Sequence, residues 1–344
     1  MSKERASKTL KVFVTGKLSQ KAFDALQNFA QVDAYESDDP MPREQVEARL
    51  EGKDALVCIL GDQVDAALFQ KRPQLKLVAN VAVGYDNINV ADANEAGVLI
   101  TNTPGVLDNA TADLAFGLLL AAARRIVEAD GFVRRGEWTG WKRELMLGAE
   151  LNGKTLGIVG MGRIGKAVAK RARAFGLNII YTRKCDDAKT DGELKKAFDA
   201  QRVSLQDLCK LSDFISINCP LRQETRHLIG KAEFALMQAH CVLVNTSRGA
   251  VIDEEAMIDA LEQKKIASCG LDVFEREPLV PERLMALPNV VLAPHIGSAT
   301  KETRAGMDEL AVKGLLEAFS GKLPANAVNP DVWNKFAEKL KSKV

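Results

Sequence analysis

The sequence has few histidines, few aromatic residues and no paired cysteine motif. Only three of its 344 residues are histidine, and 6% are aromatic. So few histidines argue against a metal site built from imidazoles. The six cysteines are dispersed without a CxxC pair, and most lie in or beside apolar segments. We therefore interpret them as reduced core residues and expect a cytoplasmic protein with no bound metal.

The chain also lacks an excess of charge of either sign and a long apolar run. Its 47 basic and 46 acidic residues give a formal net charge of +1, so no global field favours nucleic acid or a membrane surface. The N-terminus has no apolar signal core. The most hydrophobic stretch, residues 114–123, is too short to span a bilayer and is flanked by charged residues. We expect neither a nucleic-acid partner nor a membrane.

Short apolar runs alternate with helical patterns along the chain. Before residue 104 they predict helices at 20–29, 43–50 and 92–96 and strands at 11–14, 32–35, 55–60, 77–80 and 99–101. After residue 150 they predict six strands, at 155–159, 178–181, 214–218, 242–245, 268–273 and 290–293. Such alternation is typical of parallel sheets covered by helices. We therefore expect an α/β protein with two doubly wound parallel-sheet units, of which the second is a dinucleotide-binding Rossmann sheet.

The two predicted units are separated by a break in the pattern. Pro104 and Gly105 interrupt the alternation and mark the expected boundary. A nearly continuous apolar helix is predicted after it, from about residue 110 to 127, with Asp108 or Asn109 as its cap. Its apolarity favours burial between domains or subunits. The lysine-rich segment 334–344 is expected to be a frayed helix or basic tail.

A G-M-G-R-I-G turn at residues 160–165 lies between a predicted strand and a predicted helix. Gly160 permits a tight turn, Gly162 lets the backbone approach a pyrophosphate, and Gly165 lets the helix pack on the sheet. Arg163 and Ile164 open the helix, whose amides and positive dipole end face the phosphates. The turn therefore predicts a bound dinucleotide.

The strand after this turn ends in Thr182-Arg183-Lys184, where an NAD site carries an acidic residue. A carboxylate would repel a ribose 2′-phosphate, whereas Arg183 can bind that phosphate through two hydrogen bonds and Thr182 can add a hydroxyl. We therefore expect NADPH as the cofactor, with NADH used less well. Two alternatives stay open: Asp186 or Asp187 could restore a preference for NAD, and the stretch could be a solvated basic loop.

Three charged side chains follow predicted strands of the second unit: Arg248, Glu277 and His295. The carboxyl ends of parallel strands meet at one edge, so we expect these side chains beside the pyrophosphate turn. An imidazolium can protonate a carbonyl oxygen, a carboxylate can hold it in that form, and a guanidinium can bind a substrate carboxylate. Each of these residues taken alone also has a non-catalytic explanation: Arg248 could form a surface ion pair, and Glu277 and His295 could be ordinary turn residues. His227, in a charged segment, and His240, before a strand, are weaker candidates.

The chain resembles the D-isomer-specific 2-hydroxyacid dehydrogenases, and within them the glyoxylate/hydroxypyruvate reductase branch. The resemblance runs from about residue 11 to 330. It rests on the G-M-G-R-I-G turn and on N-V-A-V-G-Y-D-N-I at 80–88, N-T-S-R-G-A-V-I-D at 245–253, G-L-D-V-F-E-R-E-P at 270–278 and P-H-I-G-S-A-T at 294–300. It implies NADPH-dependent reduction of glyoxylate or hydroxypyruvate to the D-2-hydroxy acid.

The resemblance also implies a domain arrangement and roles for individual residues. A flavodoxin-like substrate domain, residues 8–103 plus 294–333, would receive the Rossmann domain, residues 104–293, as an insertion. Arg248 would bind the substrate, His295 would act as general acid, and Glu277 would orient and charge His295.

By the same resemblance, Asp272 would lie beside the nicotinamide carboxamide. The expected protein is a homodimer, and the residues expected to line the substrate pocket are Leu60, Gly61, Val83 and Gly84, with Trp141 contributed by the partner subunit.

Three alternatives to this function remain. The chain could reduce a larger acid such as 2-ketogluconate, or it could be an NAD-linked enzyme of the D-lactate type. Outside enzymes, it could be a nucleotide-sensing binding module like the corepressors of the same family.

Overall fold

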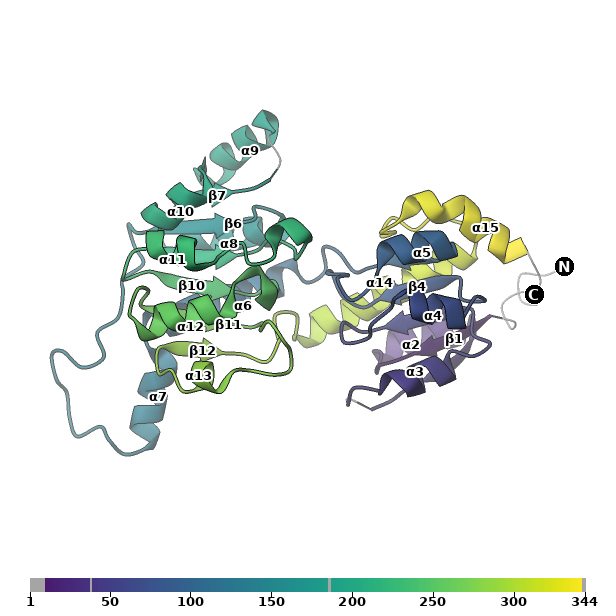
Figure 1. Ribbon diagram of the computed structural model, residues 1–344, viewed down its shortest axis with the longest axis horizontal. Coiled ribbons are helices and arrows are strands. Elements are labelled where there is room, and N and C mark those ends of the chain that lie inside the picture. Colours follow the sequence, from purple (N-terminus) through teal and green to yellow (C-terminus); the bar gives the residue numbers. More distant parts are fainter. Residues whose placement is uncertain (1–9, 38, 185–186, 342–344) are drawn as a thin grey trace. The chain divides into compact units, whose positions relative to one another are not determined.

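The computed structural model describes residues 10–37, 39–184 and 187–341, which form two compact units (Figure 1). The first unit comprises the chain up to Leu107 and from Ala299 onward, and the second comprises Asp108–Ser298. These divisions lie four and five residues after the predicted boundaries at 103/104 and 293/294. Residues 8 and 9 of the predicted first domain, and 342–344 of the predicted tail, lie outside the described residues.

The first unit is built on a five-stranded parallel sheet in the order β2-β1-β3-β4-β5, which is the flavodoxin-like order. Its strands are β1 (Lys11–Val14), β2 (Gln31–Ala34), β3 (Ala55–Cys58), β4 (Leu77–Asn80) and β5 (Leu99–Thr101). Its helices are α2 (Gln20–Gln27), α3 (Arg43–Arg49), α4 (Ala66–Lys71), α5 (Val90–Ala96), α14 (Lys301–Phe319) and α15 (Trp333–Lys341), with a 3-10 turn η3 (Pro330–Val332). Strands β3, β4 and β5 are buried throughout, which explains why they are apolar except at the last residues of β4 and β5, Asn80 and Thr101.

Helices cover both faces of this sheet. One core lies between the sheet and α2, α14 and α15, and a second lies between the opposite face and α3, α4 and α5 (Figure 1). The sheet therefore presents its carboxyl edge, rather than a face, to any ligand.

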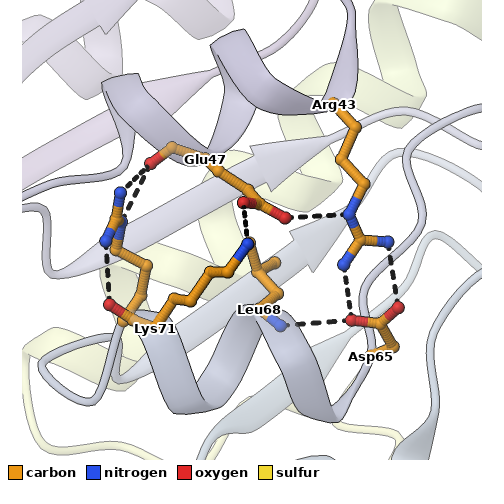
Figure 2. A network of polar contacts seen from close by, with 6 residues as sticks. Arg43, Glu47, Asp65, Leu68 and Lys71 are labelled. Atoms are coloured by element: carbon orange, nitrogen blue, oxygen red, sulfur yellow. Dashed lines mark hydrogen bonds and ion pairs between the residues drawn. The ribbon is translucent and has the colours of Figure 1, made fainter.

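A polar network joins α3 to α4 (Figure 2). Arg43 donates to both carboxylate oxygens of Asp65 at 2.9 and 2.7 Å and to Glu47 at 2.9 Å. Asp65 is also the N-cap of α4 and accepts from the Leu68 amide at 3.1 Å. Lys71 donates to Glu47 at 2.6 Å. The hydrogen bonds from Arg43 hold the pKa of Asp65 below its usual value, so the network adds charged contacts at the start of α4 to the apolar burial of Leu68 and Phe69.

The second unit is built on a seven-stranded parallel sheet in the order β12-β11-β10-β9-β6-β7-β8. The strands are β6 (Thr155–Val159), β7 (Asn178–Thr182), β8 (Gln201–Arg202), β9 (Phe214–Ile217), β10 (Val242–Asn245), β11 (Ser268–Leu271) and β12 (Val290–Leu292). Numbered from β6, the order is the 3-2-1-4-5-6 of Rossmann sheets with one strand added beside the sixth. The two-residue edge strand β8 is not among the six predicted strands, because it is too short to show a period.

Helices cover both faces of this sheet as well. They are α6 (Asp108–Ala123), α7 (Ile126–Arg134), α8 (Arg163–Ala174), α9 (Ala188–Phe198), α10 (Leu205–Leu211), α11 (Lys231–Leu236), α12 (Glu254–Glu262) and α13 (Glu282–Met285), with 3-10 turns η1 (Gln223–Thr225) and η2 (Gly249–Val251). One core holds side chains of α6 and α8, and the other holds those of α10, α11 and α12.

The single helix predicted over residues 110–127 is wrong. Helix α6 ends at Ala123, Arg125 adopts a left-handed backbone with φ of +54°, and α7 begins at Ile126. The apolar surface of α6 is explained by burial within the second unit, where it packs on α8 and β11. Figure 1 shows α7 and the segment after it standing away from the seven-stranded sheet.

The C-terminal segment predicted as a frayed helix or basic tail is a packed helix, α15. Its Phe336 is completely buried and stacks on Trp333, with the ring centroids 5.3 Å apart. Lys339 donates to the Ala96 carbonyl at 2.5 Å. The lysines therefore lie on one side of an amphipathic helix. Because they are numerous, the lysine-rich composition predicts a tail although the other side of the helix is apolar.

Among the described residues, no helix is long and apolar enough to cross a membrane. No group of three or more His, Cys, Asp or Glu side chains among them is arranged to hold a metal ion. The five described cysteines are buried and free, and Cys185 lies outside the described residues.

Candidate active site

The glycine turn after β6 is packed backbone against backbone. Gly160 has φ of +96°, and a Cβ there would lie 2.6 Å from the amide nitrogen of Cys219. A Cβ on Gly165 would lie 2.2 Å from the carbonyl oxygen of Gly160. Both positions therefore exclude a side chain. The backbone of the glycine turn packs closely against the start of α8 on one side and against the residues after β9 on the other.

Gly162 differs from Gly160 and Gly165, the other two glycines of the turn, because open space surrounds it. It is the N-cap of α8, no side chain caps the helix, and no acidic residue stands in its first turn. A Cβ on Gly162 would meet no protein atom within 4 Å. The amides of Arg163 and Ile164 thus begin a 12-residue helix at an open position, which fits the pyrophosphate of a dinucleotide.

The three residues expected at the ribose lie at the end of β7, beside this turn. The Thr182 carbonyl accepts from the Gly160 amide at 3.0 Å. Arg183 donates through Nε to Asp191 at 3.0 Å, and Lys184 Nζ lies 2.5 Å from Glu224. The structure therefore brings the predicted cations to the turn but pairs both with carboxylates. Of the two acids that could favour NAD, Asp187 caps α9 by accepting from the Lys189 amide, and Asp186 lies outside the described residues.

His295 and Glu277 form a hydrogen-bonded pair at the carboxyl edge of the same sheet. His295 Nδ1 lies 2.7 Å from Glu277 Oε2, and both side chains are about 30% exposed. Burial alone would raise the pKa of Glu277. The hydrogen bond and charge of His295, the amide of Phe274 and the charge of Arg248 outweigh it, so the pKa of Glu277 is lowered. The pair is thus arranged as an imidazole held by an ionised carboxylate.

Arg248 is brought to this pair by two loops in direct contact. It is the N-cap of η2, immediately after β10, and its Nη1 donates to the Ser247 carbonyl at 2.7 Å. A Cβ on Gly249 would lie 1.9 Å from the carbonyl carbon of Phe274. The loop after β10 therefore lies against the loop that carries Glu277, and only glycine fits at the contact.

Asp272 holds the turn on which His295 stands. Its carboxylate oxygens accept from the amides of Ile296 and Gly297, each at 2.7 Å, and its carbonyl accepts from the His295 amide at 2.9 Å. Burial raises the pKa of Asp272, and the two amides offset part of that rise. His295 has φ of +54°, so Asp272 fixes an uncommon backbone conformation. The predicted contact of Asp272 with the nicotinamide stays a prediction.

All three histidines pair with carboxylates, so pairing alone does not identify the general acid. His227 Nε2 lies 2.8 Å from Glu275, and His240 Nε2 lies 2.7 Å from Asp213. His240 precedes β10 and therefore lies at the amino edge of the sheet. His227 follows β9 and lies at the carboxyl edge as well, where its amide donates to the Ala250 carbonyl at 2.8 Å. His295 is distinguished from it by the charge of Arg248 acting on its partner, Glu277.

The lowered pKa of Glu277 gives a pH-dependent contribution to stability. Because its pKa is lower folded than unfolded, that contribution is complete above its ordinary pKa of 4.5 and is lost as the pH falls through the lower folded value. We expect Glu277→Gln to remove this part of the acid dependence. Urea unfolding from pH 3 to 7 should give a difference between wild type and variant that shrinks toward acid. A constant difference would contradict the ionised pair.

The residues expected to line the substrate pocket in the first unit all follow strands at its carboxyl edge. Leu60 and Gly61 come after β3, and Val83 and Gly84 come after β4. Asparagine side chains hold the second loop: Asn80 donates to the Gly84 carbonyl at 2.9 Å, and Asn102 donates to the Val83 carbonyl at 2.7 Å. Trp141, by contrast, lies in the segment after α7 and is 83% exposed.

Sequence reasoning missed several of the contacts that support this site. Asp191, which pairs with Arg183, and Asn102 belong to none of the catalytic patterns. Asn80 lies within the motif at 80–88, but its side-chain partner could be found only from the fold. Asp272 itself is predicted from the resemblance, but its contacts with the amides of Ile296 and Gly297 could be found only from the fold.

Comparison with known proteins gives a consistent relationship. The family model described as "D-isomer specific 2-hydroxyacid dehydrogenase, NAD binding domain" matches residues 116–297. The glyoxylate reductase of Thermococcus litoralis is 49% identical over 326 residues, which cover 94% of this chain and 97% of that protein. The crystal structure of a glyoxylate reductase from Paecilomyes thermophila superposes with a TM-score of 0.83 at 37% identity, covering 94% of this chain and 99% of that one.

A third similar structure was determined with ligands. The NADPH-dependent glyoxylate/hydroxypyruvate reductase of Sinorhizobium meliloti, in complex with NADP and malonate, superposes with a TM-score of 0.82 at 31% identity and covers 94% of this chain and 98% of that one. The predicted family and fold class are confirmed, and the protein is an oxidoreductase that uses a nicotinamide dinucleotide. The chain belongs to the D-isomer-specific 2-hydroxyacid dehydrogenases, in their glyoxylate reductase branch.

Proposed function

We propose that this chain reduces a short 2-oxo acid, glyoxylate or hydroxypyruvate, to the D-2-hydroxy acid with NADPH. The observation that carries the proposal is the 2.7 Å pair of His295 and Glu277 at the sheet edge that also carries the dinucleotide turn. The names of the relatives from Thermococcus litoralis and Sinorhizobium meliloti support the choice of substrate.

The three charged residues divide the work on the substrate. Arg248 binds the carboxylate of the 2-oxo acid and orients its carbonyl. His295, held at Nδ1 by Glu277, gives the proton on Nε2 to the oxygen as negative charge develops there. Glu277 stabilises the imidazolium before the transfer. The nicotinamide, when bound, supplies the hydride. In the first unit, the residues proposed to bind the substrate are Leu60, Gly61, Val83 and Gly84, with the backbone amides at 83 and 84 donating to its carboxylate.

The preference for NADPH rests on the residues after β7. Arg183 and Lys184 are cations, and Thr182 adds a hydroxyl, at the place where an NAD site has an acid. A structure of a similar reductase holds NADP. NADH is expected to serve less well, because it lacks the phosphate that these cations bind.

We also propose that two copies of the chain form a dimer in the cytoplasm. Apolar side chains of α7 and the segment after it are exposed in the single chain, among them Ile126, Val127, Val133, Trp138 and Trp141. Such a concentration of exposed apolar residues is typical of an interface. In the dimer, Trp141 would reach the pocket of the partner subunit. The buried free cysteines support a reducing compartment.

The experiment that tests the proposal is a matrix of kcat/KM values for NADPH and NADH against glyoxylate, hydroxypyruvate, pyruvate and 2-ketogluconate. We expect the highest values for NADPH with glyoxylate or hydroxypyruvate. A maximum at 2-ketogluconate, or at pyruvate with NADH, would replace the proposed substrate by one of the alternatives. Binding of NADPH without turnover of any acid would indicate a nucleotide-sensing module instead.

A further inference from the structure

Arg183 already has a carboxylate partner within the second unit. Its Nε donates to Asp191 Oδ1 at 3.0 Å, its Nη2 lies 2.8 Å from the same oxygen, and Nη2 also donates to the Asp187 carbonyl at 2.8 Å. Only 16% of the Arg183 side chain is exposed. The guanidinium is thus held by α9, the helix that follows β7, rather than extended into solvent.

Asp191 is itself held from the sheet side. The Tyr181 hydroxyl donates to Asp191 Oδ1 at 2.6 Å, and Arg202 Nη1 lies 3.5 Å from Oδ2. Arg202 also donates to the Arg183 carbonyl at 3.1 Å. The hydrogen bond from Tyr181, with the charges of the two arginines, lowers the pKa of Asp191, so it is ionised at neutral pH. Asp191 therefore places a fixed negative charge beside the cation proposed to bind the 2′-phosphate.

A 2′-phosphate at Arg183 would stand close to this carboxylate. The phosphate carries a charge of about −1.5 to −2 at neutral pH, and like charges a few ångströms apart repel one another. A 2′-hydroxyl carries no charge and meets no such repulsion. The charge on Asp191 consequently weakens the binding of NADPH and leaves the binding of NADH unaffected.

We propose that Asp191 is a specificity-determining residue: its carboxylate competes with the 2′-phosphate for Arg183 and limits the preference for NADPH over NADH. The inference rests on the proposed role of Arg183 in cofactor binding. It accounts for the expected, weaker use of NADH by a chain with cations after β7. Asp191 is thus an acidic residue near the ribose site. The usual rule, which looks for the acid of an NAD site at the end of the second strand, does not find it, because Asp191 lies in α9 and not at the end of β7.

A purely structural role for Asp191 predicts the opposite result. If Asp191 served only to hold Arg183 in place for the phosphate, its removal would weaken the binding of NADPH. If it competes with the phosphate, its removal tightens that binding. The sign of the change in NADPH affinity therefore distinguishes the two roles.

The test measures dissociation constants of NADPH and NADH for the full chain by isothermal titration calorimetry, without substrate. We expect Asp191→Asn to tighten NADPH about 2- to 5-fold, the effect of one partly exposed charge interaction, and to leave NADH unchanged. The gain should shrink as salt is added. Asp191→Glu, which keeps the charge, should keep the wild-type ratio. Glu193→Gln removes an exposed charge from the same helix and should also leave the ratio unchanged.

Weaker or unchanged NADPH binding in Asp191→Asn would overturn the inference. A folding defect would appear in the circular dichroism melting curve, and Asp191→Ser then repeats the measurement with a smaller side chain. Arg183→Gln separates the inference from the function on which it rests. If that variant weakens NADPH and NADH equally, the proposed phosphate contact is wrong; if it weakens NADPH alone while Asp191→Asn has no effect, only the role of Asp191 is wrong.

Discussion

Replacing His295 with glutamine is expected to lower kcat for the reduction of glyoxylate by about 10²–10⁴-fold, the usual contribution of general acid catalysis. Glutamine keeps a polar group opposite Glu277 but has no proton that it can give up near neutral pH. The geometry behind the expectation is the 2.7 Å contact between His295 Nδ1 and Glu277, which leaves Nε2 as the ring nitrogen proposed to face the substrate. The dissociation constant of NADPH should stay near the wild-type value, because the dinucleotide turn belongs to another loop.

The other two histidines provide a matched control, His240, and an alternative proton donor, His227. His240 pairs with Asp213 at 2.7 Å at the amino edge of the sheet, and His227 pairs with Glu275 at 2.8 Å. His240→Gln removes an imidazole with a carboxylate partner away from the site and is expected to leave kcat within about twofold. His227 lies against the loop of Arg248, because its amide donates to the Ala250 carbonyl at 2.8 Å, so His227→Gln tests the rival proton donor. Near-normal kcat in His295→Gln, with a large loss in His227→Gln, would move the proton donor to His227.

The sequence predicts the fold well where a single local pattern decides it. The central strands of both sheets follow from mainly β-branched and apolar runs, because strands buried on both faces need apolar residues at most positions. The helix after residue 108 is different. Its apolar pattern continues through Ile126 and Val127, but the backbone turns at Arg125, which has no intrinsic tendency to end a helix. A side-chain pair with Glu128 holds the break, and no propensity reveals it.

For the candidate site, the sequence predicts which residues gather but not what else they contact. Arg248, Glu277 and His295 follow strand ends, and parallel topology alone brings strand ends to one edge. The pairing of Arg183 with Asp191 depends on the direction in which α9 leaves β7, which residues 183–187 do not encode in any recognisable pattern. The anchoring of the His295 turn by Asp272 is likewise a contact between two loops, visible only once the sheet is formed.

The composition of the C-terminal helix α15 suggests a solvated tail, whereas the structure shows a packed helix whose contribution to stability can be measured. Four of the nine residues of α15, Trp333–Lys341, are lysine or glutamate, and this polar content suggests a solvated tail. The helix nevertheless completes a core of the first unit. Phe336 packs against Trp333 and lies 5.7 Å, centroid to centroid, from the ring of Phe319 in α14. A side chain so enclosed contributes through dispersion contacts and the exclusion of water together.

We expect Phe336→Ala to lower the free energy of unfolding by about 3–5 kcal/mol, the range for removing a phenylalanine ring from a core. The cavity would open between α14, α15 and the sheet of the first unit, so the loss should appear as a lower urea midpoint of the full chain. Glu338→Ala, at an exposed position of the same helix, should change the free energy by less than about 0.5 kcal/mol. Equal, small effects of both substitutions would mean that α15 adds no stability and that residues 334–341 behave as the tail their composition suggests. A large loss in Phe336→Ala alone would instead make the last helix an integral part of the unit that carries the loops at Leu60 and Gly84, because those loops follow strands of the sheet that α15 covers.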